Sequence, residues 1–475
     1  MDDFQRELLD RLPLGQAVLS LFSHVLSAPF LDDLYEANRG PCYQGKLTFP
    51  AVLHLVRDAL VVHGGSGRAS FAEARERGRL AATPRAVYGK LGRMPLAVSA
   101  ALLREATARA RGVLPAGGRP VAALPGSLGA FAGVTLDGKT IKHVAHRLKC
   151  LRQRRGRVNS GKLLAALDWG SGLAVAFEPT ANSEANDVSL VDGLLAQLGP
   201  AAAGERRLFL ADRQFCDLPR LAAFAAGGHH FLVRYNRNVY FHPDPGRPAA
   251  DGVDRDGRRY VQEWGWLGAA GHRQRRYVRR VTLYRPGEDD VAVVTDLTDA
   301  AAFPAQDLLD AYLGRWAIER MFQQVTEVFD LRHLIGGTPN ATLFQSGFCL
   351  LLYNLIQVVR RYVARAGDRA VEDVSAEKLF ADCKAELATW ATAGDPDAAA
   401  DAFPADANAT QVRGRLRRLL GGLWRDRWLK APSQATHAKT RTTVYPTKGY
   451  TNVWKVLQDH RPNPQRAKPA PKQPT

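Results

Sequence analysis

The sequence has few cysteines, no long uninterrupted apolar run and no internal repeats. Five cysteines, an odd number without a CxxC spacing, predict neither a disulfide framework nor a structural zinc site, and they fit a reducing cytosol. No apolar run reaches the roughly 18 residues of a membrane-spanning helix. The acidic start, MDDFQRELLDRL, differs from a signal peptide. We therefore expect a cytoplasmic protein with no membrane partner.

Acidic residues are also scarce relative to basic ones. There are 47 Asp and Glu residues against 65 Lys and Arg, which gives a formal net charge of +18 and a pI near 9.9. A positive excess of this size predicts a polyanionic partner, and nucleic acid is the obvious one. The length of 475 residues predicts about two to four folding units, and 46% apolar residues suffice for a substantial core.

The spacing of apolar residues changes along the chain and predicts five regions. Apolar periodicity and glycine and proline punctuation indicate helices first, then alternating strands and helices of a mixed α/β sheet with antiparallel early strands and parallel later ones. The regions are a helical region at 1–128, which we expect to bind DNA, the first part of the sheet at 129–236, a β-rich insertion at 237–290, a returning strand with two helices at 291–366, and a basic helical region with a proline-rich tail at 367–475.

Three carboxylates stand at positions that favour a shared site. Asp137 ends the first predicted strand of the sheet, Asp212 ends the fourth, and Glu319 lies on a predicted amphipathic helix at 311–326. If the two strands are neighbours, the aspartates converge, and clustered carboxylates need cations between them. Oxygen ligands select Mg²⁺ or Mn²⁺, and two such ions about 3.5–4 Å apart would activate a water or hydroxyl against a phosphodiester.

Each carboxylate also has a structural interpretation. Asp137 precedes a glycine and is typical of a turn, and Asp212 is placed to cap a helix or pair with Arg213. Glu319 is placed to pair with Arg315 one helical turn earlier. Further acidic residues also follow apolar runs, namely Asp168 and Asp296. The joint pattern of position, strand order and surrounding charge favours the shared site.

Three motifs in order around these residues carry a resemblance. The first is TLDGKTIK around Asp137, and the second is LFLADRQFCD around Asp212. The third is the spacing Y-x2-R-x3-E-x6-K, in which Tyr312, Arg315 and Glu319 match and Thr326 stands in place of the lysine. With these motifs the sequence resembles the DDE transposases of bacterial insertion sequences, specifically the insertion sequence four group, from about residue 40 to residue 450.

The resemblance implies a fold, an activity and a set of ligands. The fold would be an RNase H-like mixed sheet flanked by helices, with a β-rich insertion before Glu319. Asp137, Asp212 and Glu319 would bind two Mg²⁺ (or Mn²⁺) ions. The enzyme would nick transposon inverted-repeat ends by hydrolysis and join the freed 3′-hydroxyl to target DNA. It would act as a homodimer in the synaptic complex and be associated with the bacterial nucleoid.

DNA-binding residues are predicted beside the carboxylates and in the insertion. The resemblance implies that Tyr312 and Arg315 contact DNA phosphates. The run KTIKHVAHRLKCLRQRRGRVNSGK after Asp137 contains no acid, so its basic residues favour phosphate contacts over a merely solvated loop. The remaining candidates are Lys139, Lys142, Arg147, Arg154 and Arg155 in that run, Arg213, and Arg276 in the insertion.

Two tryptophans of the insertion, Trp264 and Trp266, are candidates for stacking on an unpaired base. The alternative is that they form one packed face of a strand. For the whole chain, two alternatives to an active transposase stay open. A domesticated DNA-binding protein that has lost catalysis is favoured by Thr326 and opposed by the intact acidic residues. An RNase H-like nuclease unrelated to transposition is disfavoured by the Tyr312–Arg315–Glu319 spacing.

Overall fold

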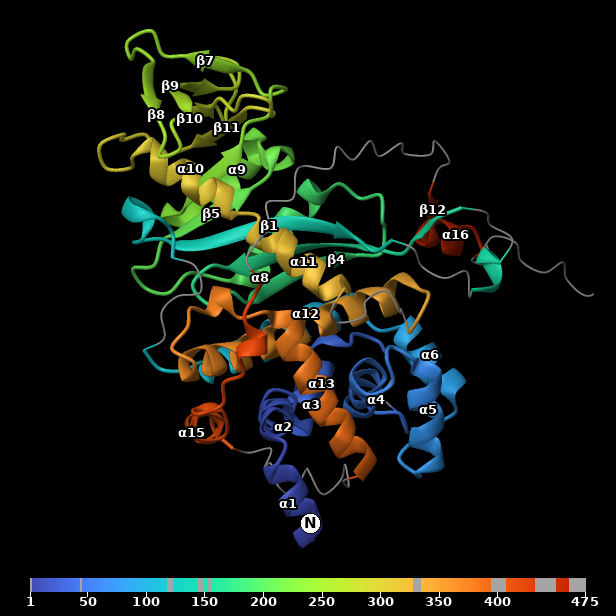
Figure 1. Ribbon diagram of the computed structural model, residues 1–475. Coiled ribbons are helices and arrows are strands. Elements are labelled where there is room, and N and C mark those ends of the chain that lie inside the picture. Colours follow the sequence, from blue (N-terminus) through green and yellow to red (C-terminus); the bar gives the residue numbers. More distant parts are fainter. Residues whose placement is uncertain are drawn as a thin grey trace, which may run out of the picture.

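A large mixed sheet and a layer of helices make up the protein (Figure 1). The computed structural model describes residues 2–42, 45–117, 123–142, 148–152, 156–327, 335–393, 407–431 and 450–460. The proline-rich tail predicted after residue 460 lies outside the described residues.

The centre of the sheet is strand β1 (Ala132–Thr140). On one side β1 pairs antiparallel with β3 (Lys162–Asp168), which pairs antiparallel with β4 (Ala174–Thr180). On the other side β1 pairs parallel with β5 (Arg207–Ala211), which pairs parallel with β6 (His230–Arg234). The order β4-β3-β1-β5-β6 confirms the predicted antiparallel first strands and parallel later ones.

Within the region expected to be a β-rich insertion, strands lie between residues 241 and 283, and they extend the same sheet. Strand β11 (Val291–Thr295) pairs antiparallel with β6 and with β10 (Arg276–Leu283). The sheet continues from β10 through β9 (Arg259–Leu267) to β7 (Phe241–Pro243), and β8 (Ala250–Val253) pairs with β9. Figure 1 shows this extension at the top of the molecule.

Helices cover both faces of the sheet, because apolar side chains of its strands point alternately to one face and the other. Val134 and Leu136 of β1 belong to an apolar cluster with α8 (Val191–Leu198) and α9 (Leu218–Phe224). The other face packs against α10 (Ala305–Gly314) around β5 and β6. Since strand side chains alternate, Thr135 and Asp137 point to this second face, which is the face of the candidate site.

Helix α12 (Pro339–Ala366) is the long apolar helix that the sequence indicates. Together with α7 (Leu96–Gly112) it packs against β4. Within the described residues it is long and apolar enough to cross a membrane, as is the bent pair of α2 (Pro13–Val25) and α3 (Ala28–Asn38) if counted as one span. The apolar window of α12 is fully buried inside the protein, which is the property of a core helix.

The helices of the two chain ends form one layer around α12. C-terminal helices α13 (Ala376–Ala393) and α15 (Ala409–Leu420) both pack on α2. Glu386 of α13 accepts hydrogen bonds from the backbone N–H groups of Leu14 (2.8 Å) and Gly15 (2.9 Å) at the start of α2. A carboxylate from one end of the chain therefore caps a helix at the other.

The remaining elements complete the helical layer and the sheet margin. The helices are α1 (Asp3–Asp10), α4 (Phe49–Val61), α5 (Gly67–Glu76), α6 (Pro84–Gly92), α11 (Ala317–Glu327) and α16 (Val453–Asp459). A separate two-stranded sheet pairs β2 (Val158–Asn159) in parallel with β12 (Thr451–Asn452). This pairing brings the C-terminal segment beside the chain that follows β1.

Candidate active site

Asp137 and Asp212 stand on neighbouring parallel strands, as the sequence predicts. The paired positions of β1 and β5 end at Thr135 and Leu210. Asp137 and Asp212 each follow two residues later, so the two side chains leave the same face of adjacent strands. One detail differs from the prediction: β1 continues to Thr140, so Asp137 lies within the strand, whereas Asp212 directly follows β5 and begins a 3₁₀ turn, Arg213–Phe215.

The expected single helix over 311–326 is two helices with a break between them. Helix α10 ends at Gly314 and α11 begins at Ala317. Gly314 packs so closely on Trp169 that a Cβ there would lie 2.5 Å from the indole. The backbone N–H of Arg315 donates to the carbonyl of Tyr312 (3.1 Å), an i→i−3 bond that tightens the turn. The break turns Arg315 toward the sheet.

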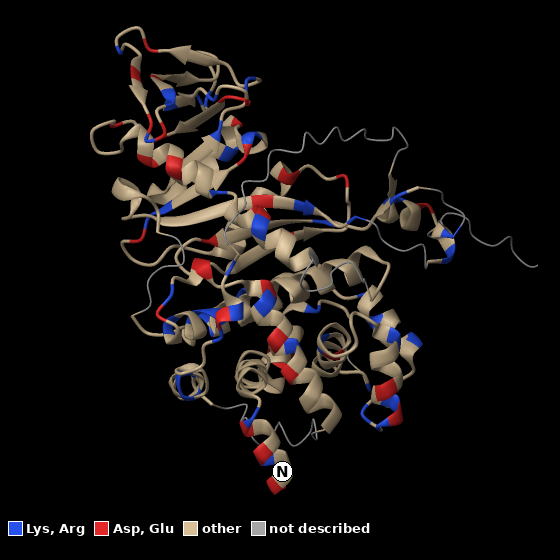
Figure 2. Ribbon diagram, in the orientation of Figure 1, with Lys and Arg blue, Asp and Glu red and all other residues tan. Residues whose placement is uncertain are grey.

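Arg315 interacts electrostatically with all three acids. Figure 2 shows the basic residues in blue and the acidic residues in red along the whole ribbon. Arg315 is only 5% exposed, and its Nη2 lies 3.1 Å from Oε1 of Glu319. Burial opposes its charge, yet Tyr312, Asp212, Glu319 and Asp137 together outweigh burial and raise the pKa of Arg315. One buried cation therefore interacts favourably with all three predicted catalytic carboxylates but balances only one of their charges.

Tyr312 is buried as well, at 4% exposure, with its ring 5.6 Å from the guanidinium of Arg315. Burial raises the pKa of Tyr312 to about 12; Arg315 opposes the rise and Asp212 adds to it. Tyr312 and Arg315 are thus buried in the interior, and they do not lie on a solvent-exposed polar face of a helix. Their contact with DNA phosphates stays a prediction.

Asp137 carries a destabilised negative charge. Burial raises the pKa of Asp137 to about 6; Arg315 and the N–H of Gly138 lower it, while Glu319 and Asp187 raise it further. A carboxylate that is costly to ionise gains more than an exposed one from a cation placed beside it.

This cost leads to a stability prediction. Because its folded pKa lies above the unfolded value, Asp137 destabilises the fold fully above about pH 6, and the effect fades as pH falls toward 4. Asp137→Asn should therefore stabilise the metal-free protein by about 1–3 kcal/mol at pH 7.5 and by much less at pH 4.5. Urea unfolding at both pH values measures the free energy of unfolding. A gain at pH 7.5 no larger than the gain at pH 4.5, or a loss of stability at pH 7.5, would contradict the prediction.

The carboxylates suit a hard divalent cation in their chemistry, but they do not form a preformed cage. Across the described residues, no group of three or more His, Cys, Asp and Glu side chains is gathered closely enough to hold a metal ion. Oδ1 of Asp212 is buried and has no hydrogen-bond partner within the described part of the chain. An unpartnered buried carboxylate oxygen is a free ligand position, and Arg315 supplies the positive charge beside it.

The competing acids that follow strands have structural partners. Asp168 accepts a hydrogen bond from the backbone N–H of Ser171 (2.8 Å) and pairs with Arg111 (3.2 Å). Asp296 accepts from the N–H of Phe231 (3.0 Å) and lies 3.2 Å from Nδ1 of His230. Both aspartates thus stabilise local structure at the end of a strand. Asp137 and Asp212 remain as the two strand-end acids that interact with Arg315.

Several predicted DNA-binding residues lie beside this pair. The ammonium of Lys139 stands 5.7 Å from the ring of Phe322 on α11, and Lys142 and Arg213 are exposed. Arg276 begins β10, away from the carboxylates in the sheet extension. The other predicted residues, Arg147, Arg154 and Arg155, lie outside the described residues.

The two insertion tryptophans differ in exposure. Trp264 is 5% exposed, donates from Nε1 to the carbonyl of Thr298 (2.7 Å) and packs under Arg247, so it serves the packed face of the strand. Trp266 is 37% exposed. Trp316, which the sequence alone does not single out, is 56% exposed in the break between α10 and α11. Its only sequence signal is a tryptophan on the polar side of the apolar periodicity.

The position of the missing lysine lies near the end of α11. Thr326 donates its hydroxyl to the carbonyl of Phe322 (2.7 Å) within the same helix. A threonine bound to its own backbone supplies no cation there.

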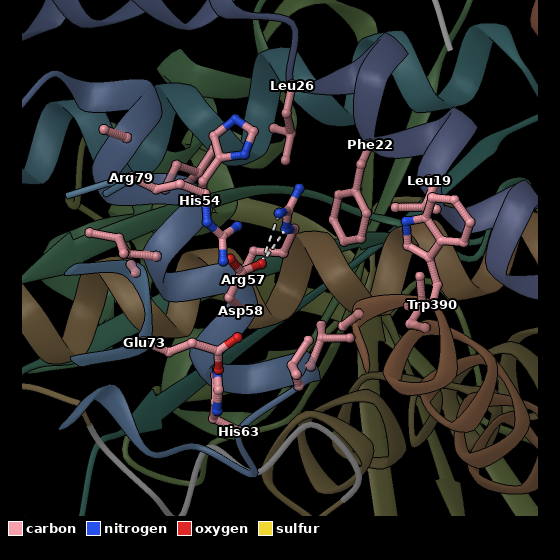
Figure 3. Close-up of a pocket in the computed structure, with 18 of the residues that line it drawn as sticks. Leu19, Phe22, Leu26, His54, Arg57, Asp58, His63, Glu73, Arg79 and Trp390 are labelled. Atoms are coloured by element: carbon pink, nitrogen blue, oxygen red, sulfur yellow. Dashed lines mark hydrogen bonds and ion pairs between the residues drawn. The ribbon is translucent and has the colours of Figure 1, made fainter. Parts of the chain in front are cut away.

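A cavity of about 570 Å³ lies elsewhere, among the helices α2, α4, α5 and α13 (Figure 3). Its polar lining includes two internal pairs, Arg57–Asp58 (2.8 Å) and His63–Glu73 (3.1 Å). None of the converging carboxylates lines it, so it is separate from the site described here.

Comparison with known proteins agrees with the site's location. Residues 132–355 match the model of the transposase DDE domain, and this span contains all three converging acids. The chain is 25% identical over 238 residues to the "Probable transposase for insertion sequence element IS5377" of Geobacillus stearothermophilus, covering 44% of this chain and 60% of that protein. It is 30% identical over 84 residues to the Sinorhizobium fredii protein y4zB, named as a transposase, covering 18% of this chain and 23% of that one.

A solved structure is also similar, the piggyBac transposase synaptic complex with hairpin DNA. The likeness has a TM-score of 0.39 and 11% identity, and covers 86% of this chain and 85% of that one. The alignments span 60% of the first relative's length and 23% of the second's. By its match over residues 132–355, the chain contains a transposase DDE domain.

Proposed function

We propose that the protein is an active transposase that cleaves DNA at transposon ends and joins them to target DNA. The observation that carries this proposal is the β1–β5 register, which places Asp137 and Asp212 on one face of adjacent chain segments, together with Glu319 at 3.1 Å from the buried Arg315. The strand order β4-β3-β1-β5-β6, antiparallel first and parallel later, supports an RNase H-like core for the domain. Acids on adjacent strands, joined by a glutamate from a covering helix, suit phosphodiester chemistry.

We propose that Asp137, Asp212 and Glu319 hold divalent cations, Mg²⁺ or Mn²⁺, as a pair of ions. A bound cation would stabilise charge on the phosphodiester oxygens and lower the pKa of an attacking water. Asp212 contributes its unpartnered Oδ1, and Asp137 relieves its costly charge. Glu319 would hold the cation in place of its ion pair with Arg315, and the guanidinium of Arg315 would then be available to a phosphate.

The DNA backbone would run past the basic side chains that lie next to the two aspartates. Lys142, which follows β1, and Arg213, which follows β5, are both exposed. Lys139 on β1 lies beside Phe322 of α11. Contacts of this kind make binding strongly dependent on salt. We propose that two copies of the chain assemble on paired transposon ends, and sedimentation of the protein with end DNA should then show two chains per complex.

The test of this function is an assay with plasmid DNA that carries the inverted repeats flanking the gene. Wild-type protein with Mg²⁺ should nick at the repeat ends and then join the free ends to a second plasmid. Nicking without joining would indicate a nuclease unrelated to transposition. Binding to the repeats without nicking would indicate the impaired DNA-binding descendant, which Thr326 in place of lysine favours.

Trp316 is expected to stack on a base of the bound end. Its indole is 56% exposed in the turn that carries Arg315, and stacking of a base on an aromatic ring contributes about 1–3 kcal/mol. Trp316→Ala should weaken binding to an end with unpaired bases by roughly 5- to 100-fold. Fluorescence anisotropy measures the affinity.

Trp316→Phe should retain most of that affinity, because it keeps an aromatic face. Tyr240→Ala, which removes an exposed ring (68%) from the sheet extension, is the matched control. Equal losses from Trp316→Ala and Tyr240→Ala would argue against a specific stacking contact at the site. The stability of Trp316→Ala should change by no more than about 0.5 kcal/mol, since the side chain is exposed.

A further inference from the structure

Asp187 is a buried carboxylate that the proposed chemistry does not use. It begins the 3₁₀ turn Asp187–Leu190 between β4 and α8 and is 7% exposed. Its Oδ1 lies 2.7 Å from Nζ of Lys162, and its Oδ2 accepts a hydrogen bond from Nε2 of Gln214 (2.9 Å). Lys162 also donates to the carbonyl of Ala185 (2.9 Å), which fixes the ammonium in place.

The same carboxylate touches both chain segments that carry the predicted catalytic aspartates. A Cβ on Gly138, the residue after Asp137, would lie 2.4 Å from Cγ of Asp187, so the carboxylate rests against the backbone of β1. Gln214, its hydrogen-bond donor, lies two residues after Asp212. One side chain therefore connects the backbone next to Asp137 with the turn that follows Asp212.

The sheet does not fix the separation of these two segments by itself. The pairing of β1 with β5 ends at Thr135 and Leu210, before either aspartate. Beyond that point β1 continues as a strand, whereas the other chain turns into Arg213–Phe215. A contact that spans both segments can therefore constrain the distance between Asp137 and Asp212.

Asp187 differs from a cation ligand in its partners. Its Oδ1 lies 2.7 Å from Nζ of Lys162 in an ion pair, whereas Oδ1 of Asp212 has neither a hydrogen bond nor an ion pair within the described residues. A buried ion pair holds its geometry well, because separating the charges in a protein interior is costly. Lys162 and Asp187 together form a buried ion pair with no net charge and a fixed geometry.

We propose that Asp187 is a positioning residue that sets the separation of Asp137 and Asp212 through Gly138 and Gln214. The inference rests on the proposed function, since the separation matters only if the two aspartates hold cations jointly. Mg²⁺ requires nearly ideal octahedral geometry, so a small change in ligand separation lowers its affinity. Partners that orient ligands in this way typically contribute 10- to 100-fold to metal affinity or activity.

The test is Asp187→Asn, which keeps the shape of the side chain and removes its charge. The Mg²⁺ concentration that gives half of the metal-induced increase in Tm should rise by about 10- to 100-fold. Affinity for transposon-end DNA without metal should stay within about twofold. The control is Asp192→Asn on α8, which loses a largely exposed ion pair with Arg220 and should leave the Mg²⁺ dependence unchanged.

A merely structural role would lower the Tm without metal and leave the Mg²⁺ midpoint unchanged, and that result would overturn the inference. If Asp187→Asn does not fold, Gln214→Leu is the second variant, because it keeps the Lys162–Asp187 pair and removes only the bridge. An unchanged Mg²⁺ midpoint in Gln214→Leu would also overturn the inference.

Where both variants fold, their effects on the Mg²⁺ midpoint should be less than additive, since they interrupt one bridge. Additive effects would contradict a shared route. The Tm titration needs no DNA cleavage, so it separates this inference from the proposed function. Failure of the wild type to cleave would count against the function, and normal Mg²⁺ binding by Asp187→Asn would count against the inference alone.

Discussion

Replacing Asp212 by asparagine is expected to abolish DNA cleavage and strand joining while leaving the fold and DNA binding intact. The substitution preserves size but removes the charge that makes the unpartnered Oδ1 a cation ligand. A cation at such a site contributes several kcal/mol to transition-state stabilisation, so the rate should fall by at least about 1,000-fold. Single-turnover nicking of plasmid carrying the transposon ends measures the rate, and anisotropy measures binding.

The matched control is Asp296→Asn, a second aspartate that directly follows a strand of the same sheet. Its Oδ1 accepts from the N–H of Phe231 at 3.0 Å, a contact that asparagine preserves. This variant should cleave at a rate within a few-fold of wild type. If Asp212→Asn cleaves as fast as Asp296→Asn, the assignment of Asp212 to the active site is wrong.

Replacing Arg315 by methionine should destabilise the metal-free protein and make it more responsive to Mg²⁺. The guanidinium is the buried cation shared by Asp137, Asp212 and Glu319, and removing one partner from a buried ionic cluster costs about 3–5 kcal/mol. Partial protonation of the acids will reduce this cost. Mg²⁺ should then raise the Tm of the variant more than that of wild type, since the cation no longer competes with Arg315.

Arg315→Lys is the control for charge, because it keeps a cation but loses the planar fork. It should lose less stability than Arg315→Met and show a Mg²⁺ response closer to wild type. Urea unfolding with and without Mg²⁺ gives the free energies for all three proteins. A methionine variant as stable as wild type in the absence of metal would show that Arg315 is not the counter-ion of the carboxylates.

The sheet could be predicted from sequence, because each strand is indicated by the composition of a short continuous segment. The apolar runs before Asp137 and Asp212 are long enough to be buried strands, and the alternation with helices implies parallel pairing of the later strands. Parallel neighbours then bring the two aspartates together, as the β1–β5 register shows. The end of β1 was misplaced, because Asp137–Gly138 has the composition of a turn although the strand passes through it.

The break between α10 and α11 could not be predicted in the same way. Apolar spacing continues across the break almost in phase, so periodicity predicts one helix. At the break, Gly314 packs against Trp169, which occupies the space where a side chain at position 314 would project. That contact joins residues distant in sequence. Tyr312 and Arg315 beside the break are buried, whereas a straight amphipathic helix would have left them on the polar face.

The insertion was predicted as a β-rich unit, but not as a continuation of the central sheet. Whether it extends the sheet depends on β10 pairing with β11 beside β6, and strand composition carries no information about which edge is used. Asp187 was not identified for a similar reason. Its partners, Lys162 and Gln214, come from separate segments, and only the folded chain brings them to one carboxylate.

The capping of α2 by Glu386 has a consequence for synthesis of the protein. The carboxylate that accepts from Leu14 lies 372 residues later in the chain. At about 5–20 residues per second, the ribosome needs roughly 20–70 s to make the intervening segment. During that time the start of α2 lacks its cap and α2 lacks α13 and α15 to pack on. A chain interrupted before α13 would therefore be released with these N-terminal helices open to chaperones and proteases.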